Sequence, residues 1–470
     1  MPIFKSVKDL IRASLPALLA LLLTGPAVAL AEGPPEERLN QLEEQVKALQ
    51  AALEELRDQQ PETPAKEETA REAHLDELER RIDLLASELE DLKIGEAAVV
   101  ADQSVHGFGP AASKVYRTED GLSIGGYGEM LYQSFDSSRD DGSPSGATDQ
   151  LDFLRAIVYF GYKWNDRWLF NSEIEFEHGS TEEDGSVSVE FAYFDYLWKP
   201  ELNLRAGLVL VPMGFLNELH EPTTFLSAKR PDTERLLIPS TWRENGLGVF
   251  GDAGGFSYRT YLVNGFDASG FSAAGLRGGR QNGSESKAED FAWVGRLDYT
   301  GTPGLLAGVS AYVGDAAQDL TGPGGTGLGV RTSILEGHVD WRWRGLELRG
   351  LWAQAEVDDA ARLNEALGLS GSGSVGEELE GFYLQAGYDV LARSGSGRSL
   401  VPFVRWEQLD TQKRVPAGFS RNPARDIESL TLGLAFKPFD RFVLKLDYQD
   451  YDNGAGTATD QLNLALGYVF

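Results

Sequence analysis

The last nine residues of the chain, Leu462 to Phe470, read LNLALGYVF. In this stretch every second residue is a leucine or an aromatic residue, and the residues between them are smaller. A period of two with one apolar face is the pattern of a β-strand. An edge strand of a soluble sheet is the alternative, but it would leave large apolar side chains on an open edge, which natural sheets avoid. The stretch therefore predicts a strand whose apolar face meets lipid.

The same alternation recurs toward the N-terminus as far as residue 121. The apolar face alternates with a face that carries charged residues, and that combination indicates a wall between lipid and a wet interior. The segment near 248 is short, and the two faces near 193 are ambiguous. We predict sixteen strands, centred near residues 127, 157, 173, 193, 207, 248, 260, 295, 309, 338, 351, 385, 404, 432, 446 and 466.

The lengths of the connections between these segments alternate. The even connections are short: 163–167, 199–201, 251–255, 300–304, 344–345, 391–398 and 437–441. The odd connections are mostly longer and polar: 133–151, 211–244, 265–290, 315–329, 358–378 and 410–425. Bacterial outer-membrane barrels have short periplasmic turns and long external loops, whereas a soluble β-sandwich does not produce this rhythm. The rhythm predicts an even number of strands with both ends of the barrel in the periplasm.

These patterns give the fold class and the compartment. We predict an all-β transmembrane barrel of about 16 antiparallel strands over 121–470, in the bacterial outer membrane and in contact with its lipid. The final aromatic residue resembles the assembly signal of outer-membrane barrels. After the leader, the sequence has no run of 18 apolar residues, which excludes a helical membrane protein. The 53 glycines and 42% hydrophobic content also suit a barrel.

The N-terminal part is predicted to hold a leader and a coiled coil. Residues 1–31 read as a signal peptide, with Lys5, Lys8 and Arg12 before an apolar stretch and an Ala-Leu-Ala site that ends at residue 31. Residues 32–94 form a periplasmic α-helical coiled coil with a Pro-containing break at 57–72, and 95–120 is a linker. The heptad positions are Leu39, Leu42, Val46, Leu49, Leu53 and Leu56, then Leu75, Leu78, Ile82, Leu85, Leu89 and Leu92.

Leucine at both seam positions leaves the number of helices open. We expect a homotrimer because the barrel suggests one. A helix packed on another domain is the alternative for this region.

Several functions are excluded by composition. The formal net charge of -30 would repel nucleic acid, so we expect no nucleic-acid partner. The absence of cysteine removes disulfides and thiolate sites. The five histidines lie in no catalytic or metal-binding motif, and His338 between Glu336 and Asp340 is read as a lumen residue. We therefore expect no enzymatic activity, no cofactor and no metal.

The third long connection, 211–244, combines many large apolar residues with charged ones. A connection of this length in a compact fold is usually functional or disordered, and its apolar content requires burial. We expect it to fold into the lumen as a constriction. Its candidate anion contacts are Lys229, Arg230, Arg235 and Arg243, with Glu218, Glu221, Asp232 and Glu234 as counter-charges.

The predicted inward face of the wall carries both signs of charge. The basic residues are Arg155, Arg205, Arg259, Arg296, Arg342, Arg405 and Lys445, and the acidic residues are Glu129, Glu173, Glu175, Glu177, Glu336, Asp340 and Asp447. Two interpretations stay open. The charges form a wet wall of pairs, or they set a transverse field that selects ions by sign.

Three segments carry a family resemblance: 125–129, 173–178 and 212–246. With them, residues 120–470 resemble the phosphate-selective porin O/P family. The resemblance implies a sixteen-stranded, trimeric channel for passive diffusion, often preferring anions such as phosphate. Selective members use a ladder of Arg and Lys, and the acidic column of Glu173, Glu175 and Glu177 departs from such a ladder.

The predicted function is a porin for small hydrophilic solutes or ions. The main alternative is an outer-membrane anchor whose coil contacts the cell wall and whose barrel conducts little or nothing. A second alternative is a closed transporter, which would need an N-terminal plug in the lumen, and the acidic coil suits that role poorly.

Overall fold

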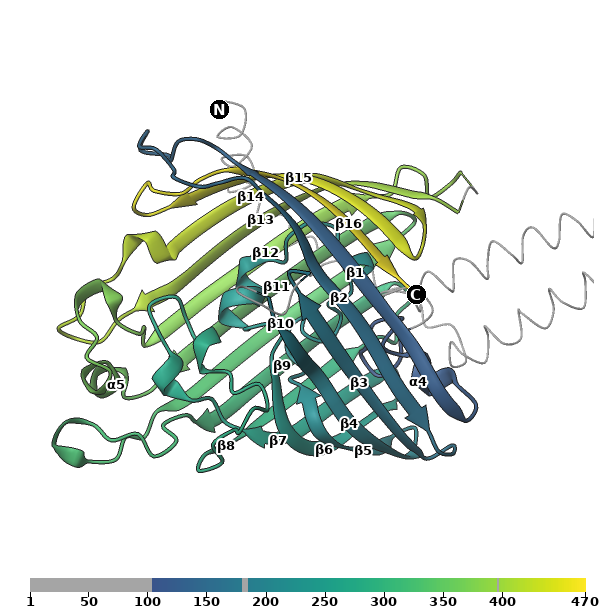
Figure 1. Cartoon of the computed structure of the whole chain (residues 1–470), viewed down its shortest axis with the longest axis horizontal. Helices are drawn as coiled ribbons and strands as arrows, with labels where there is room; N and C mark the ends of the chain where they lie inside the picture. The colour runs from purple at the N-terminus through teal and green to yellow at the C-terminus, as the bar shows by residue number, and fades with distance from the viewer. Residues whose placement is uncertain (1–103, 180–184, 395–396) are drawn as a thin grey trace, which may run out of the picture. The chain divides into compact units, whose positions relative to one another are not determined.

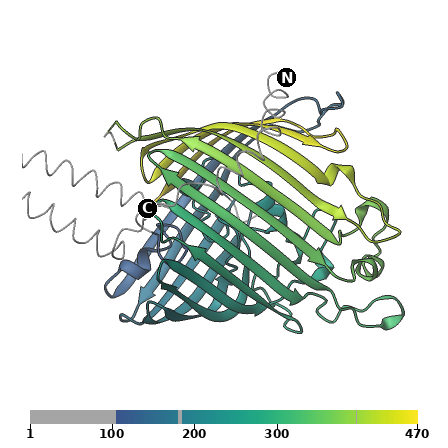
Figure 2. The ribbon, with the colours of Figure 1, turned by 180° about the vertical axis from the view of Figure 1, so that it is seen from behind.

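The structure is a computed structural model that describes residues 104–179, 185–394 and 397–470. The chain divides into two compact units, Met1–Ala97 and Ala98–Phe470. The predicted signal peptide and coiled coil lie outside the described residues. Figure 1 views the second unit from the side of its first strands, and Figure 2 shows the later strands from behind.

Sixteen strands form the second unit. Their bounds are β1 Gly121–Phe135, β2 Gln150–Lys163, β3 Trp168–Glu177, β4 Val187–Lys199, β5 Leu202–Leu210, β6 Arg243–Ala253, β7 Phe256–Asn264, β8 Phe291–Tyr299, β9 Leu305–Asp315, β10 Arg331–Trp343, β11 Leu346–Val357, β12 Glu378–Tyr388, β13 Ser399–Arg414, β14 Asp426–Phe439, β15 Phe442–Asn453 and β16 Gln461–Val469. Each of the sixteen predicted centres falls within one of these strands.

Short helices lie in the segments before and between the strands. Their bounds are α4 Lys114–Arg117, η1 Pro222–Thr224, η2 Thr233–Leu237, η3 Ala268–Gly270, η4 Arg277–Gly279, η5 Pro323–Gly325, α5 Ala360–Ala366, η6 Gly371–Gly373 and η7 Pro423–Arg425. Among the described residues, no helix has both the length and the apolar content to cross a membrane.

The sheet closes on itself. Every strand is antiparallel to its neighbours in sequence, and β16 pairs with β1 from Tyr127↔Val469 to Phe135↔Gln461. Past the last paired residues, Gly126 and Phe470 exchange two backbone hydrogen bonds of 3.1 and 2.9 Å. Closure satisfies the strand edges that an open sheet leaves unpaired. The predicted fold, a closed antiparallel barrel of 16 strands, is confirmed.

The two faces of the wall differ as the alternation predicted. In β16, Asn463 is fully buried whereas Leu464 is 51% exposed. The outer surface carries exposed Leu, Val, Phe and Trp side chains on strands all around the barrel. A continuous apolar exterior on a closed sheet is the surface that a lipid bilayer solvates.

A β-bulge resolves the two faces near residue 193. The pairing between β3 and β4 passes from Glu173↔Phe191 to Ile174↔Val189, so Glu190 is an extra residue in β4. Both Glu190 and Phe191 are fully buried as a result. A simple alternation could not assign both of them to one face, because a bulge breaks the period of two.

The interior is apolar in one region. Val263, Val294, Ile334, Ala353 and Leu379 face inward from β7, β8, β10, β11 and β12 and belong to one buried cluster. That cluster also includes residues of the long connections after β5 and β7. The wall is therefore charged in some places and apolar where a loop packs against it.

We expect Val309→Arg to destabilise the barrel in lipid. Val309 lies in the middle of β9 with its side chain 54% exposed on the outer face. A basic residue on the lipid face of a barrel costs roughly 2–4 kcal/mol near the bilayer midplane. Denaturant titration of folding into phospholipid vesicles measures the change. Ala288→Arg, at an exposed position in the connection after β7, is the control and should be neutral. An equal loss in both variants would contradict the lipid-facing assignment.

Candidate functional site

The connection between β5 and β6, residues 211–242 and called L3 below, lies inside the barrel. Its large apolar side chains are buried: Val211, Met213, Phe215, Leu216, Leu219, Phe225, Leu226, Leu237, Ile238 and Trp242. An exposed loop with this composition would leave a large apolar area in water. Burial against the inner wall removes that cost and places the charged residues of L3 in the lumen.

Glu218 anchors L3 to one wall. Its carboxylate lies 3.3 Å from Arg259 of β7 and 3.8 Å from Arg296 of β8. Asp298 contacts the same two guanidinium groups at 2.6 and 2.8 Å. Arg296 also donates to the carbonyl of Gly214. Two arginines and two carboxylates thus balance their charges where water is largely excluded, which buried ions require.

The opposite wall holds the next part of L3. The amide of Ala228 donates to Asp447 of β15 at 2.5 Å. Lys445 donates to the carbonyl of Ser227 at 3.0 Å, and Arg405 of β13 donates to the Ser227 hydroxyl at 2.5 Å. Because β7 and β15 lie on opposite sides of a closed ring of sixteen strands, L3 crosses the lumen rather than following one wall.

Glu234 ties the two limbs of L3 together. Its Oε2 atom accepts from the amides of Phe215 and Leu216 at 2.7 and 2.6 Å, and its Oε1 atom accepts from the Tyr383 hydroxyl at 2.6 Å. Burial raises the pKa of Glu234 above its ordinary value. The amide of Thr233 donates to Glu407 of β13, which fixes η2 against the wall.

Two arginines of the connection between β7 and β8, residues 265–290 and called L4, hold the last limb of L3. Arg280 donates to the carbonyls of Thr241 and Pro239 at 2.7 and 3.1 Å, and Arg277 donates to that of Ser240. Their partners here are neutral carbonyls, so neither guanidinium is neutralised by these bonds.

The charges near L4 repel one another. Burial, followed by the charges of Arg280, Arg230 and Arg235, lowers the pKa of Arg277 to about 9. Burial and the charge of Arg243 lower the pKa of Arg280 to about 10. These shifts mark a concentration of positive charge over the end of L3. We call Arg230, Arg235, Arg243, Arg277 and Arg280 the arginine group.

The segment ahead of β1 also enters the barrel. Phe108 is buried and packs on Phe191 and Tyr193 of β4, with ring centroids 5.4 and 5.5 Å apart. The Arg205 guanidinium lies 4.7 Å from the Phe108 ring and 4.1 Å from the Tyr193 ring. We call residues 104–117 the inner segment. They fall within the range predicted as a linker, and they form an ordered contact with the wall.

Polar bonds complete this contact. The Tyr116 hydroxyl donates to Asp195 at 2.7 Å and accepts from Arg205 at 2.8 Å, and Arg205 pairs with Asp195. Burial raises the pKa of Tyr116 well above its ordinary value, so the phenol stays protonated and donates.

Glu221 of L3 binds the inner segment by hydrogen bonds. Its Oε1 atom accepts from the amides of Ala111 and Ala112 at 2.9 and 3.1 Å. A side chain at Gly109 would meet the Glu221 carboxylate at 2.5 Å and would have to displace it from the amides of Ala111 and Ala112. Burial raises the pKa of Glu221 to about 7.

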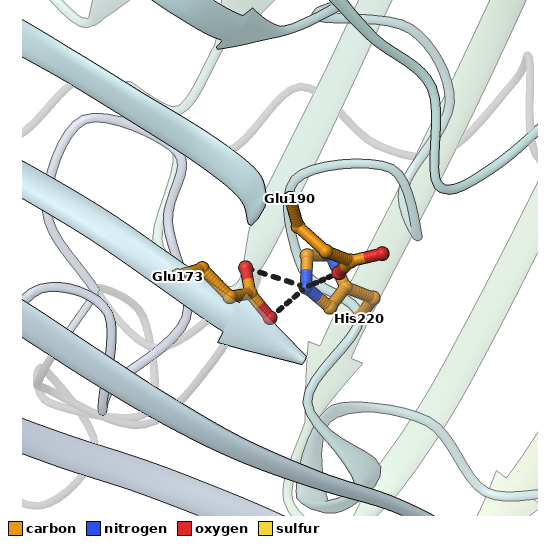
Figure 3. A group of neighbouring side chains, drawn as sticks. All are labelled: Glu173, Glu190 and His220. Atoms are coloured by element: carbon orange, nitrogen blue, oxygen red, sulfur yellow. Dashed lines mark hydrogen bonds and ion pairs between the residues drawn. The ribbon is translucent and has the colours of Figure 1, made fainter. Parts of the chain in front are cut away.

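Glu173, Glu190 and His220 meet where L3 passes β3 and β4 (Figure 3). The Nε2 atom of His220 lies 3.0 and 3.2 Å from the two oxygens of Glu173 and 3.4 Å from Oε2 of Glu190. All three residues are buried. Burial lowers the pKa of His220 below its ordinary value.

The predicted constriction residues occupy different positions in L3. Glu218, Glu221 and Glu234 are buried anchors. Asp232 pairs with Arg235 at 2.6 Å. Lys229 is half-buried, and burial lowers its pKa. Arg230 is also half-buried, and its Nη2 atom has no hydrogen-bond partner among the described residues.

Arg243 is the first residue of β6 rather than part of L3, so L3 ends before the predicted boundary at residue 244. Its guanidinium lies 3.4 Å from Glu190 and 3.1 Å from the Ser188 hydroxyl. From its position on the wall, the Arg243 side chain reaches the same region as the other predicted cations of the constriction.

The predicted wall residues lie in local pairs. Arg155 contacts Glu129 and Glu175 at 3.5 and 3.7 Å. Arg342 contacts Asp340 at 3.2 Å, and Asp340 also pairs with Arg349 at 2.6 Å.

Other predicted wall residues contact groups that were not among the predicted wall residues. Glu336 contacts His338 at 2.8 Å, and Arg405 lies 3.9 Å from Glu407. Glu177, the last residue of β3, is half-buried and accepts from Ser186. Glu173 meets His220, as described above. Within the predicted acidic column, Glu173 and Glu175 both neighbour Glu190, whereas Glu177 lies apart at the end of β3.

Sequence reasoning missed three parts of the site. Arg277 and Arg280 belong to the run LRGGR, 276–280, whose two arginines stand out in an acidic chain. The inner segment carries the run HGFGP, 106–110, where glycines around an aromatic residue could have indicated close packing. Glu190 was missed because of the bulge.

A relative from Aquifex aeolicus (strain VF5), described as an uncharacterized protein, is 37% identical over 375 residues, which cover 77% of this chain and 83% of that protein. No protein-family model matches the chain, so the resemblance to the phosphate-selective porin O/P family stays a prediction.

Several solved structures of outer-membrane proteins are similar at low identity. A loop L8 deletion mutant of OmpT of Vibrio cholerae is 11% identical with a TM-score of 0.48, and the match covers 75% of this chain and 100% of that chain. The anion-selective porin from Comamonas acidovorans is 12% identical with a TM-score of 0.47, with the same coverage. The channel DcaP of Acinetobacter baumannii is 13% identical with a TM-score of 0.44, covering 74% and 97%. Identities this low transfer no residue roles.

We expect Phe108→Ala to release the inner segment. Loss of a buried phenylalanine costs about 3 kcal/mol, which raises the population of a locally open state about 100-fold. The chain has no cysteine, so Val115→Cys, at a position 1% exposed, reports opening by maleimide labelling without background.

The control for this measurement is Ala288→Cys, which is exposed and should label fast in both backgrounds. Labelling of Val115→Cys at the same slow rate with and without Phe108 would show that this ring does not hold the segment.

Proposed function

This chain belongs to the same family as the Aquifex aeolicus protein, and we propose that it is an outer-membrane porin, a passive channel for small hydrophilic solutes or ions that favours anions. The observation that carries this proposal is the arginine group over L3, inside a closed barrel with an apolar exterior. Two of its members, Arg277 and Arg280, direct their bonds to L3 carbonyls instead of carboxylates. Their positive charge stays available to an ion in the lumen.

Local charge, not net charge, supports the anion preference. The chain carries a formal charge of -30, but a low-dielectric channel responds to the charges at its narrowest part. Lys437 and Lys445 also donate to L3 carbonyls, those of Thr223 and Ser227. L3 thus brings its backbone, rather than only carboxylates, to the cations of the wall. Phosphate and other oxyanions suit such guanidinium and ammonium groups.

The predicted oligomer and cell-wall contact form part of the same proposal. We expect three barrels to associate in the outer membrane, with the signal peptide removed and the coiled coil in the periplasm. Mass spectrometry of the detergent-solubilised chain measures the oligomer.

An anchor with little conductance is the second candidate, because one observation favours it. L3 contacts both walls, and the inner segment occupies the lumen beside β4 and β5. Planar-bilayer recording of the folded, full-length barrel separates the two functions. A porin gives discrete current steps, whereas a barrel that is folded by its gel mobility and yet gives no steps supports the anchor.

We expect Arg230→Gln to weaken the anion preference. Arg230 is half-buried in L3, and its Nη2 atom has no hydrogen-bond partner among the described residues, so its loss breaks no bond of that atom. The ratio of anion to cation permeability should fall about fivefold, which corresponds to about 1 kcal/mol for one screened charge near the ion.

Reversal potential in a potassium chloride gradient measures this ratio. Arg139→Gln, in the exposed connection after β1, removes the same charge away from the lumen and is the matched control. A wild-type channel that prefers cations would overturn the anion preference while leaving the porin proposal intact.

A further inference from the structure

The group Glu173, Glu190 and His220 is built from three separate elements. Glu173 comes from β3, Glu190 is the bulged residue of β4, and His220 comes from L3. A β-bulge re-aims a side chain, and here it turns Glu190 inward beside Glu173. The ligand-type atoms of the three residues all lie within 4.8 Å of one another, and each residue is at most 2% exposed.

The hydrogen bonds fix one nitrogen of His220. Its Nδ1 atom lies 3.0 Å from the backbone carbonyl of Asn217. A carbonyl oxygen only accepts, so Nδ1 carries the proton and donates. In the neutral ring, Nε2 then has a lone pair, and that lone pair faces the carboxylate oxygens of Glu173 and Glu190. Three electron-pair donors that converge in a dry site repel one another unless a proton or a metal ion lies between them.

Arg243 is the cation in contact with this group, and Arg155 and Arg230 act on it from beyond bonding distance. Glu173 has two side-chain partners among the described residues, His220 and the neighbouring acid Glu190. Arg243 and the Thr241 hydroxyl contact Oε1 of Glu190, at 3.4 and 2.6 Å. The other oxygen, Oε2, has no hydrogen bond and lies 3.4 Å from Nε2 of His220. A fully buried carboxylate oxygen thus points into the group without a donor.

The separations agree with those of a metal centre. Zinc binds imidazole nitrogen and carboxylate oxygen at about 2.0–2.2 Å, so ligand atoms around a tetrahedral ion lie about 3.4 Å apart. The distances from Nε2 of His220 are 3.0 Å to Glu173 and 3.4 Å to Glu190. The hydrogen bond from Nδ1 to a carbonyl is also the usual support of a histidine ligand. We propose that Glu173, Glu190 and His220 bind a divalent transition-metal ion, with zinc as its probe.

His338 provides an internal comparison. It is also buried between two carboxylates, with Glu336 2.8 Å from Nδ1 and Asp298 2.9 Å from Nε2. There, however, the two acids approach different nitrogens, and the Arg296 guanidinium lies 3.0 Å from Nε2. The protein supplies its own cation at His338. At His220 no arginine or lysine of the described residues lies within bonding distance of Nε2, which leaves that place to a metal ion.

The ion would fasten L3 to the wall. It links L3 to β3 and β4, in addition to the anchors at Glu218 on β7 and β8, Ser227 on β13 and β15, and Glu234 on β12. This site goes beyond the proposed porin function, because a barrel of either function could carry it. Its metal content is measured independently of conductance.

Metal analysis of the full-length protein tests the site. The chain is produced without a histidine tag, folded in detergent with zinc chloride, desalted into buffer with EDTA, and analysed by inductively coupled plasma mass spectrometry. We expect about one zinc ion per wild-type chain, because a buried site exchanges slowly. X-ray absorption should show a nitrogen and oxygen shell at about 2.0–2.2 Å without sulfur.

His220→Gln should lower the retained zinc at least tenfold, whereas His338→Gln should retain the wild-type amount. Glu190→Gln gives a second test if His220→Gln does not fold. A wild-type barrel that retains no zinc, manganese or iron after folding with each ion overturns the proposal. Equal zinc in wild type and His220→Gln overturns it as well.

Discussion

The closure of β16 on β1 is the constraint on which the rest of the structure depends. Once Phe470 and Gly126 exchange their backbone bonds, the sheet has no edge, and period-two alternation divides every strand into an outer and an inner face. Side chains on the inner face cannot reach the outside. A charged residue there must find a partner within the lumen, because an uncompensated buried ion costs several kcal/mol. The pairs Arg205–Asp195 and Arg349–Asp340 follow from this requirement.

L3 supplies hydrogen-bond acceptors to several cations of the inner wall. Its carbonyls and hydroxyls accept from Lys437, Lys445 and Arg405, and its one buried acid near β7 and β8 completes the group around Asp298. The loop is thereby held from opposite sides at once. Neutral acceptors satisfy hydrogen bonds without cancelling charge, so a chain that is acidic overall can present a positive lumen. This difference between satisfied bonds and cancelled charge underlies the anion preference we propose.

The inner segment joins the N-terminal side of the chain to the same network. Phe108 completes an aromatic surround for Arg205, and Glu221 of L3 receives two amides of the segment. Contacts with the wall and with L3 therefore reinforce each other. The part of the chain that enters the lumen, residues 104–117, lies in the range predicted as a linker.

The sequence alone determined the sixteen strands, their inner and outer faces and the alternation of short and long connections. Each of these follows from local periodicity, which a single chain displays directly. It also placed most of the charged residues of the lumen, because their positions within a strand fix their side. Only the tertiary structure decided which of them meet. Glu173, Glu190 and His220 lie on three elements, and the bulge that turns Glu190 inward shows in the sequence only as an ambiguity of the two faces near residue 193. Arg277 contacts L3 because L3 and L4 fold into the same enclosed space. Contacts across that space depend on the closure of the barrel and not on proximity along the sequence.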